Sequence, residues 1–523
     1  MNPPCTSVGH QHLRWPLAIM CGSMQPVRER VQMQSPVVDS SYRLQLQEGA
    51  FTLSIASSTA VDAGAATNSS AAFTPAYRWY ALGLLFLVYV FNFIDRSILT
   101  LLAQPIKDEF QVSDTMIGLL SGPSFGLFYS ILGIPIARLA DRSVRRNVLV
   151  ICLTVWSAMT AVCGLVLNFW QLMAARIGVA VGEAGGSPPS HSMISDMFPQ
   201  AQRATALGIY ALGIPVGSMF GALAGGWINE ALSWRAAFLV VGLPGLLLAV
   251  LVRLTLREPP RGASEPRSEL ADTPTSTSHS TSAPTNASTS ATRTATAGPN
   301  TEMPTFAEVL RVLWSRRSFR FMALAAGFHG FVGYGVGAFI PAMFMRVHGM
   351  GSADVGTAMF FQGFAGIFGT LSAGFLADRL GRRDPRWYMW LPAIAAVLSL
   401  PFSIAVYLWT DAAQALWIYA IPNILGSYYL APSFAMTQGL VGVRMRALAA
   451  AVLLFMLTII GLCLGPFLVG VMSDYIASHS SLGVDSLRYA LCVATLVVLA
   501  AAIANLLAAR TLAADLANAA SGR

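Results

Sequence analysis

The sequence contains almost no lysine and little charge of either sign. Lys107 is the only lysine, and Asp, Glu, Lys and Arg together make up 11% of the 523 residues. The phosphate-binding signature of ATP-driven pumps requires a lysine directly after a glycine. Because Lys107 follows Ile106, ATP-driven pumping by this chain alone is excluded. A hydrophobic content of 55% likewise excludes an ordinary soluble globular protein.

Cysteine is also scarce, and the cysteines have no paired spacing. Four lie in long apolar stretches and two near the amino terminus: Cys152, Cys163, Cys463, Cys492, Cys5 and Cys21. This pattern predicts neither a disulfide framework nor a metal site, and no cofactor is expected. The net charge of +8 is spread over loops rather than clustered, so nucleic acid is not an expected partner.

What the sequence has instead is a series of apolar stretches long enough to cross a lipid bilayer. A transmembrane helix needs about 20 apolar residues. Twelve stretches qualify, at approximately 79–103, 115–137, 147–167, 171–195, 204–228, 236–253, 321–345, 355–377, 387–409, 414–440, 447–472 and 489–509. The sequence therefore predicts an all-α membrane protein with twelve transmembrane helices.

Polar, low-complexity regions divide these stretches into two groups of six. Residues 1–76 are predicted to be a disordered cytoplasmic tail, and residues 255–318 a linker rich in Ser, Thr and Pro. Such compositions bury too little apolar surface to fold. We therefore expect an amino-terminal six-helix bundle at 77–254, a carboxy-terminal bundle at 319–510, and a short tail at 511–523.

The two halves share a motif at equivalent positions, after the second and the eighth apolar stretch. The copies read Ala-Asp141-Arg142-Ser-Val-Arg145-Arg146 and Ala-Asp378-Arg379-Leu-Gly-Arg382-Arg383. A match this short is weak alone, but its recurrence at equivalent places indicates duplication. These loops are interpreted either as simple positive anchors or as a cytoplasmic gate, in which the aspartates bind arginines in one conformation and release them in another.

The distribution of arginine and lysine among the loops predicts the orientation of the chain in the membrane. Loops after even-numbered stretches hold Arg138, Arg142, Arg145, Arg146, Arg203, Arg379, Arg382, Arg383, Arg386, Arg444 and Arg446. Loops after odd-numbered stretches hold only Lys107, Arg235, Arg346 and Arg488. Because cytoplasmic loops carry the excess of positive charge, the first set, both termini and the linker are expected in the cytoplasm.

Four charged residues lie well inside the predicted membrane helices: Asp95 and Arg96 in the first, and Arg176 and Glu183 in the fourth. A charge at mid-bilayer depth costs about 2.5–3.5 kcal/mol, so such residues normally face a polar interior and have a function there. Arg176 and Glu183 are about two helical turns apart and project from nearly the same face. This arrangement predicts a path for a solute across the membrane.

These motifs resemble the major facilitator superfamily over residues 77–510. The Asp-Arg loops are similar to the superfamily signature, although Ala137 and Val144 replace glycines in the first copy. The Spinster-like branch is indicated by Asn92-Phe-Ile-Asp95-Arg96, by Arg176 with Val-Gly-Glu183-Ala, and by Gly-Pro466-Phe-Leu-Val-Gly. The resemblance implies alternating access with proton coupling, cargo of the lysolipid or sphingolipid type, and a central cavity lined by the first, fourth, seventh and tenth helices.

We predict a role in transport for each of the four charged residues within the membrane helices. Asp95 and Glu183 are candidates for proton coupling, because burial favours a protonated carboxyl group and a nearby arginine favours the charged form. Arg96 and Arg176 are candidates for binding an anionic substrate through the planar guanidinium group. The alternative is a static salt bridge between helices, such as Asp95 with Arg176.

Two polar residues in the seventh helix complete the candidate site. His329 and Tyr334 lie in a glycine-rich stretch and are expected to hydrogen-bond substrate; a packing role for the histidine is the alternative. Gly122-Pro-Ser124-Phe-Gly126 matches a hydrolase pattern, but it lies within a predicted membrane helix and lacks the required strand. No catalytic site is therefore expected.

The favoured function is a monomeric secondary transporter in a bacterial inner membrane, moving an amphiphilic or organic anion with protons. The apolar and aromatic character of the predicted cavity helices favours an amphiphile, whereas an organic carboxylate would satisfy the same arginines. A transporter-fold sensor that binds without moving its ligand is a second class. A membrane enzyme is a third, and it lacks any nucleophile or metal cluster.

Overall fold

The computed structural model describes residues 73–264, 305–442 and 445–521. The greater part of the predicted tail, 1–72, and of the low-complexity linker, 265–304, lies outside these residues. Ten helical segments of the described chain are long and apolar enough to cross a membrane. The predicted fourth and tenth segments also form, but each is broken into shorter helices.

The first half contains nine helices. They are α1 Pro75–Phe110, α2 Asp114–Ser121, α3 Pro123–Arg142, α4 Arg145–Cys163, α5 Phe169–Glu183, α6 Ser187–Met197, α7 Gln200–Ala211, α8 Gly213–Ala231 and α9 Trp234–Thr255. The pairs α2–α3, α5–α6 and α7–α8 each correspond to one predicted span. The turn expected near Asn168 is present, because the Asn168 side chain caps α5 by accepting a 2.9 Å hydrogen bond from Gln171 N.

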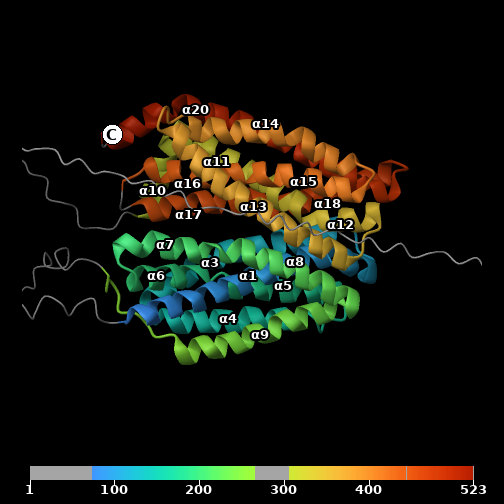
Figure 1. Cartoon of the computed structure of the whole chain (residues 1–523), viewed down its shortest axis with the longest axis horizontal. Helices are drawn as coiled ribbons and strands as arrows, with labels where there is room; N and C mark the ends of the chain where they lie inside the picture. Colours follow the sequence, from blue (N-terminus) through green and yellow to red (C-terminus); the bar gives the residue numbers. More distant parts are fainter. Residues whose placement is uncertain (1–72, 265–304, 443–444, 522–523) are drawn as a thin grey trace, which may run out of the picture. The chain divides into compact units, whose positions relative to one another are not determined.

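The second half contains the remaining helices, with π-helical and 3-10 turns between some of them. Its elements are α10 Phe306–Ser315, α11 Arg317–Gly330, η2 Phe331–Val336, α12 Gly337–His348, α13 Ser352–Gly381, α14 Trp387–Leu408, α15 Ala412–Gly426, η3 Ser427–Tyr429, α16 Leu430–Gly439, α17 Arg446–Leu457, η5 Thr458–Cys463, α18 Leu464–His479, η6 Gly483–Asp485, α19 Ser486–Thr495 and α20 Val497–Ala520. Figure 1 shows the helices of each half grouped together. Helix α10 lies within the stretch predicted as linker, and α20 continues into the predicted tail.

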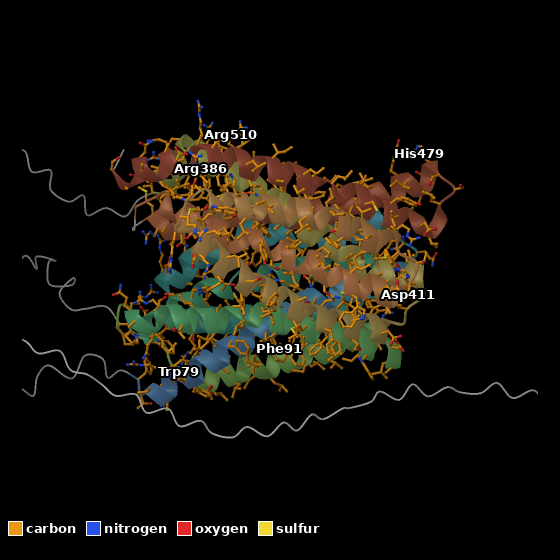
Figure 2. All side chains as sticks on the ribbon, turned by 45° about the horizontal axis from the view of Figure 1, so that its top comes forward. Trp79, Phe91, Arg386, Asp411, His479 and Arg510 are labelled. Carbon is orange, nitrogen blue, oxygen red and sulfur yellow. The ribbon has the colours of Figure 1, made fainter. Side chains whose placement is uncertain are left out.

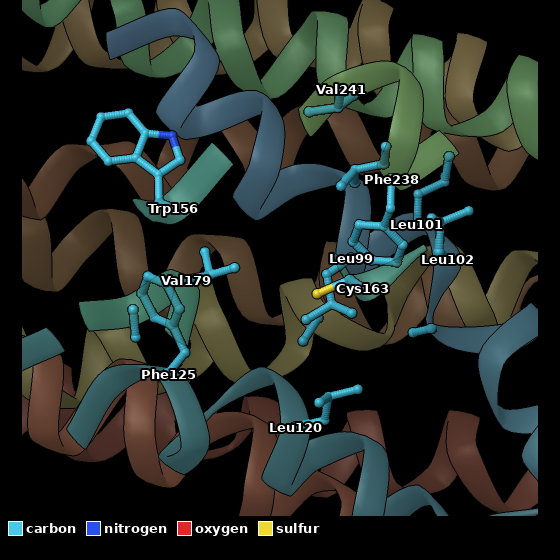
Figure 3. Close-up of a cluster of buried hydrophobic side chains, with 14 of the residues drawn as sticks. Leu99, Leu101, Leu102, Leu120, Phe125, Trp156, Cys163, Val179, Phe238 and Val241 are labelled. Carbon is cyan, nitrogen blue, oxygen red and sulfur yellow. The ribbon is translucent and has the colours of Figure 1, made fainter. Parts of the chain in front are cut away.

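Close backbone contacts, made possible by glycine, hold the helices of the first half together. A Cβ atom on Gly182 of α5 would lie 2.5 Å from the backbone nitrogen of Trp156 on α4. Close approach of this kind is typical of membrane helices, in which small residues at the contact replace a hydrophobic driving force. Figure 3 shows Trp156, Phe125 and Val179 in one cluster of buried hydrophobic side chains. The packing fixes the face on which α5 presents Glu183.

The two halves meet at the end of the bundle that carries Asp114, which we call the Asp114 end. A Cβ atom on Gly118 of α2 would lie 2.3 Å from the carbonyl oxygen of Pro466, and one on Gly470 would lie 2.2 Å from that of Asp114. We call the opposite end, with the two Asp-Arg loops, the arginine-rich end. Figure 2 shows Arg386 and Arg510 toward one end, and Asp411 and His479 toward the other.

Candidate functional site

Asp95 and Arg176 form a buried ion pair between α1 and α5. Arg176 NH1 donates to Asp95 Oδ1 at 3.0 Å, and both side chains are almost fully enclosed. The Thr160 hydroxyl of α4 also bonds to Asp95 Oδ2, so three helices meet at this carboxylate. The pair predicted as the static alternative is therefore present. Because the Asp95–Arg176 pair is buried away from water, the charge of each residue is compensated by the charge of the other.

Arg96 and Glu183 form a second pair on the same two helices. Arg96 Nε donates to Glu183 Oε2 at 2.6 Å. The Glu183 side chain is fully buried, whereas that of Arg96 is 22% exposed. Oxygen Oε1 of Glu183 is buried and has no hydrogen-bond partner among the described residues. An unpartnered buried oxygen is costly while the group is charged, and protonation removes much of that cost.

Three aromatic rings surround the Arg96 guanidinium. Its central carbon lies 5.1 Å from the ring centroid of Phe93, 4.8 Å from that of Phe125 and 4.7 Å from that of Tyr129. Each distance is within the range of a cation–π interaction. The rings hold the positive charge in place independently of Glu183, so Arg96 retains stabilising contacts when that carboxylate is neutral.

A cavity of about 360 Å³ opens beside these residues. Arg96, Arg176 and Phe125 line it from the first half, and Tyr334 lines it from the second half. Tyr334 lies in the π-helical turn η2, and its side chain is partly exposed to the cavity. Single π-helical turns inside α-helices occur frequently at functional sites. The structure thus brings together Asp95, Arg96, Arg176, Glu183 and Tyr334 at or beside this cavity.

His329 lies away from this cavity, within the second half. Its ring stacks on Tyr429 with centroids 4.7 Å apart, and its Nε2 lies 3.1 Å from Asn505 Nδ2. It is buried, although it reaches the edge of a second cavity of about 350 Å³. These contacts correspond to the packing role that the sequence left open for this histidine.

A third cavity, of about 660 Å³, lies between α8 and α13. Its lining is mostly aliphatic, with Met219, Met359, Ile367 and Leu371 as representative side chains. The volume is within the range of cavities that hold small organic ligands. An apolar chain is the chemistry that fits such walls.

The two Asp-Arg loops differ in their contacts. Arg145 is buried and bonds to Glu258 at 2.8 Å, to Ser192 at 2.7 Å, and also to Asp196. These bonds tie α4, α6 and the segment after α9 into one unit at the arginine-rich end. Asp141 and Arg142 of the same loop are exposed.

In the second loop, the three predicted gate residues Asp378, Arg379 and Arg382 are all exposed. Asp378 accepts a 3.1 Å hydrogen bond from the Tyr388 hydroxyl within its own half. The duplicated motif is therefore anchored in the first half and largely solvent-facing in the second.

Sequence reasoning missed the polar cluster at the Asp114 end. Asp114 Oδ1 accepts from Arg346 NH2 at 2.5 Å and from Lys107 Nζ at 2.6 Å, and Asp114 Oδ2 accepts from the Ser473 hydroxyl at 2.7 Å. Asp474 accepts from the backbone nitrogen atoms of Asp114 and Thr115 at 3.0 and 2.7 Å. The cluster joins α2 to α12 and α18, and therefore joins the two halves. Charged residues are common at the ends of membrane helices, so their presence in the sequence did not indicate that they pair across the two halves.

Comparison with known proteins shows the family. The sequence profile of the Major Facilitator Superfamily matches residues 85–466. An MFS-type efflux pump of Mycolicibacterium smegmatis is 34% identical over 418 residues, covering 80% of this chain and 89% of that protein. The cis,cis-muconate transport protein of Acinetobacter baylyi is 28% identical over 355 residues, covering 67% of this chain and 78% of that protein.

Among solved structures, a bacterial homologue of the human lysosomal transporter Spinster is similar. In its inward-facing, unoccupied conformation it superposes with a TM-score of 0.72 at 32% sequence identity, covering 85% of this chain and 99% of that one. The predicted resemblance to the Spinster-like branch is confirmed. The chain belongs to the major facilitator superfamily: it is a multi-pass membrane protein and a secondary transporter of a small molecule, not an enzyme.

Proposed function

We propose that this transporter couples the movement of an amphiphilic anion to protons by alternating access. The observation that carries the proposal is the Arg96–Glu183 pair, in which a partly exposed cation lining a cavity holds a fully buried carboxylate. An anion that binds the Arg96 guanidinium competes with Glu183 for it. When the arginine leaves, a proton compensates the buried carboxylate.

Bound substrate and a protonated Glu183 therefore stabilise the same state of the site, in which Arg96 has left Glu183. Arg96 supplies the bidentate surface that suits a phosphate or carboxylate group. The three aromatic rings hold its charge while the partner changes. Asp95 and Arg176, with Thr160, form the neighbouring pair, and Asp95 is the second proposed proton carrier. Tyr334 is the proposed hydrogen-bonding contact from the second half, with His329 behind it.

The aliphatic cavity between α8 and α13 supports an amphiphilic cargo of lysolipid or sphingolipid type. Ser97, Thr100 and Gly337 line both this cavity and the one beside Arg96. A ligand with an anionic head at Arg96 and an apolar chain between α8 and α13 occupies both. The similarity to the muconate transport protein supports an organic carboxylate as the alternative cargo.

The conformation suggests how access alternates. Hydrogen bonds between the halves cluster at the Asp114 end, so this end is closed. With both termini in the cytoplasm, as the arginine distribution predicts, the closed end faces outward. The Asp141 and Asp378 loops then form the cytoplasmic gate of a monomer in a bacterial inner membrane, and they close against each other in the opposite state.

The test is transport by purified protein in proteoliposomes with and without an imposed pH gradient. Movement of fluorescent lysolipid is followed by extraction with albumin, and muconate uptake is followed with radiolabel. Lysolipid movement that is saturable and accelerated by the gradient is the expected result. Movement of muconate alone makes the carboxylate the cargo, and movement of either without response to the gradient contradicts proton coupling.

A further inference from the structure

The cavity of about 350 Å³ inside the second half has an unusual lining. Most of its lining residues come from α11–η2, α14, α15–η3 and α19, with hydroxyl groups and the Asn423 amide among the side chains. Over the part of the chain that the structure describes, no Asp, Glu, Lys or Arg lines it. His329 also lines it and is buried against the ring of Tyr429, so the lining is polar and carries no formal charge while this imidazole is neutral.

The serine and threonine hydroxyl protons of this lining are committed to the protein itself, whereas the hydroxyl groups of Tyr334, Tyr419 and Tyr429 have no acceptor among the described residues. The acceptors are carbonyl oxygens of the preceding turn: Ser399 to Ala396 at 2.8 Å, Ser403 to Ser399 at 3.0 Å, Ser427 to Asn423 at 3.1 Å and Thr495 to Leu491 at 2.8 Å. Because the Thr495 proton is used, the Tyr407 hydroxyl must be the donor in its 3.2 Å contact with Thr495 Oγ1. The serine and threonine oxygens therefore face the cavity as acceptors.

A lining of neutral acceptors with a few neutral tyrosine donors selects a complementary ligand group. An anionic group would meet no cation there, and the serine and threonine oxygens would present lone pairs to it. An ammonium group would be desolvated without a compensating carboxylate, at high cost. A hydroxyl group donates a hydrogen bond and carries no charge, so it satisfies these acceptors without that penalty. The rings of Tyr419 and Tyr429 add apolar surface for the carbon atoms that bear such groups.

This cavity adjoins the one beside Arg96. Gly333, Tyr334 and Gly337 line both, and all three lie in or next to the π-helical turn η2. One ligand can therefore place an anionic group at Arg96 and an adjoining group in the second half.

We propose that the cavity around Ser399, Ser403 and Thr495 is a subsite for hydroxyl groups, and that the cargo is an anion carrying a glycerol-like or polyol group. The inference rests on the proposed function, because it takes Arg96 as the contact for the anionic group. The hydroxyl-bearing anion is either a lysolipid headgroup or a free hydroxy acid, and two pairs of probes distinguish these sources.

The test measures binding to purified protein in lipid nanodiscs. Lysophosphatidylglycerol is compared with lysophosphatidylmethanol, which has the same charge and chain but lacks the glycerol hydroxyl groups. Gluconate is compared with hexanoate in the same way. Two variants are used: the double variant Ser399→Ala/Ser403→Ala, and the control Ser124→Ala. Ser124 is equally buried and also donates to a carbonyl oxygen of the preceding turn, that of Leu120 at 2.6 Å, but it lies outside this cavity.

The expected result is that wild-type protein binds the hydroxylated member of one pair at least about fivefold more tightly, the equivalent of one neutral hydrogen bond. The preference should disappear in the double variant, with unchanged binding of the hydroxyl-free probe, and persist in Ser124→Ala. The pair of probes that shows this preference identifies the source of the hydroxyl groups, either a lysolipid headgroup or a free hydroxy acid. Equal binding within both pairs in the wild type overturns the inference, as does a preference that survives the double variant. Failure of proton coupling in proteoliposomes, with the preference intact, overturns the proposed function alone.

Discussion

Glu183 holds Arg96 through one carboxylate oxygen, at 2.6 Å, while its other oxygen is buried without a partner among the described residues. The fully buried group is thus only half satisfied, next to a cation that reaches a cavity. A structural salt bridge would be expected to satisfy both oxygens. The asymmetry is the feature that distinguishes this pair from Asp95–Arg176, in which Thr160 binds the second oxygen of the aspartate.

Replacing Arg96 by lysine should weaken anion binding. The substitution keeps the charge but removes the planar fork and its contacts with Phe93, Phe125 and Tyr129. Loss of one charge-assisted hydrogen bond predicts a dissociation constant raised about 10- to 100-fold, measured with a radiolabelled anion. Arg235→Lys is the control, because Arg235 also pairs with a carboxylate and stacks on aromatic rings, but at the Asp114 end. Equal effects of the two variants would contradict a binding role for Arg96.

Replacing Asp95 by asparagine should destabilise the protein. It leaves Arg176 buried without a counter-charge, and breaking a buried pair from one side costs about 3–5 kcal/mol. Thermal unfolding in detergent should show a lower midpoint for Asp95→Asn. The double variant Asp95→Asn/Arg176→Gln should recover much of the loss. An unchanged midpoint in Asp95→Asn would show that this pair does not stabilise the fold.

Replacing Asp114 by asparagine should favour opening of the Asp114 end. The carboxylate binds Lys107 from its own half and Arg346 and Ser473 from the other half. Spin labels at the exposed positions Leu232 and Val484, one in each half, should report a larger population of long distances. Asp411→Asn is the control, because that aspartate caps α15 within the second half. No change in the distance distribution of Asp114→Asn would show that the ion pairs do not set the closed state.

The two copies of the duplicated loop should respond differently to alanine. Arg145→Ala removes the cationic partner of Asp196 and Glu258, which keep only backbone N–H donors, and loss of charged hydrogen bonds predicts a decrease of about 2–4 kcal/mol in the free energy of unfolding. Arg382→Ala removes an exposed side chain and should change it by less than about 0.5 kcal/mol. Denaturant titration in detergent measures both. Equal losses would contradict the asymmetry between the loops.

The sequence predicted the helices and the charged cluster because both have strong physical causes. Long apolar stretches have few alternatives to membrane helices. A charge such as Arg176 within one is too costly to lack a partner. The Asp95–Arg176 pair was among the predicted alternatives, but the pairing of Arg96 with Glu183 was not predicted. Asp95 and Arg96 are neighbours on α1 and point in different directions, and the sequence does not show which partner each one meets. Asp95 meets Arg176, and Arg96 meets Glu183.

Other contacts are only weakly indicated by the sequence. Thr160 is one hydroxyl in an apolar stretch, and such groups often bond only to the preceding turn of their own helix. Thr160 lies within bonding distance of the Trp156 carbonyl in that turn, and also of Asp95. Asp114 and Arg346 occur at span ends, where charge is ordinary. Helix α10 follows a low-complexity stretch, yet buries Val309 and Leu313 completely. Only the folded chain shows what these residues contact.

The most direct test of the central claim is proton movement in the Glu183→Gln variant. Internal pH is recorded in proteoliposomes on addition of the transported anion, with binding of the same anion measured in parallel. Wild-type protein should move protons with its substrate, and Glu183→Gln should still bind substrate but move fewer protons per substrate, with Asp95 as the remaining carrier. An unchanged number of protons per substrate in Glu183→Gln would contradict the account, and the Arg96–Glu183 pair would then be a structural salt bridge.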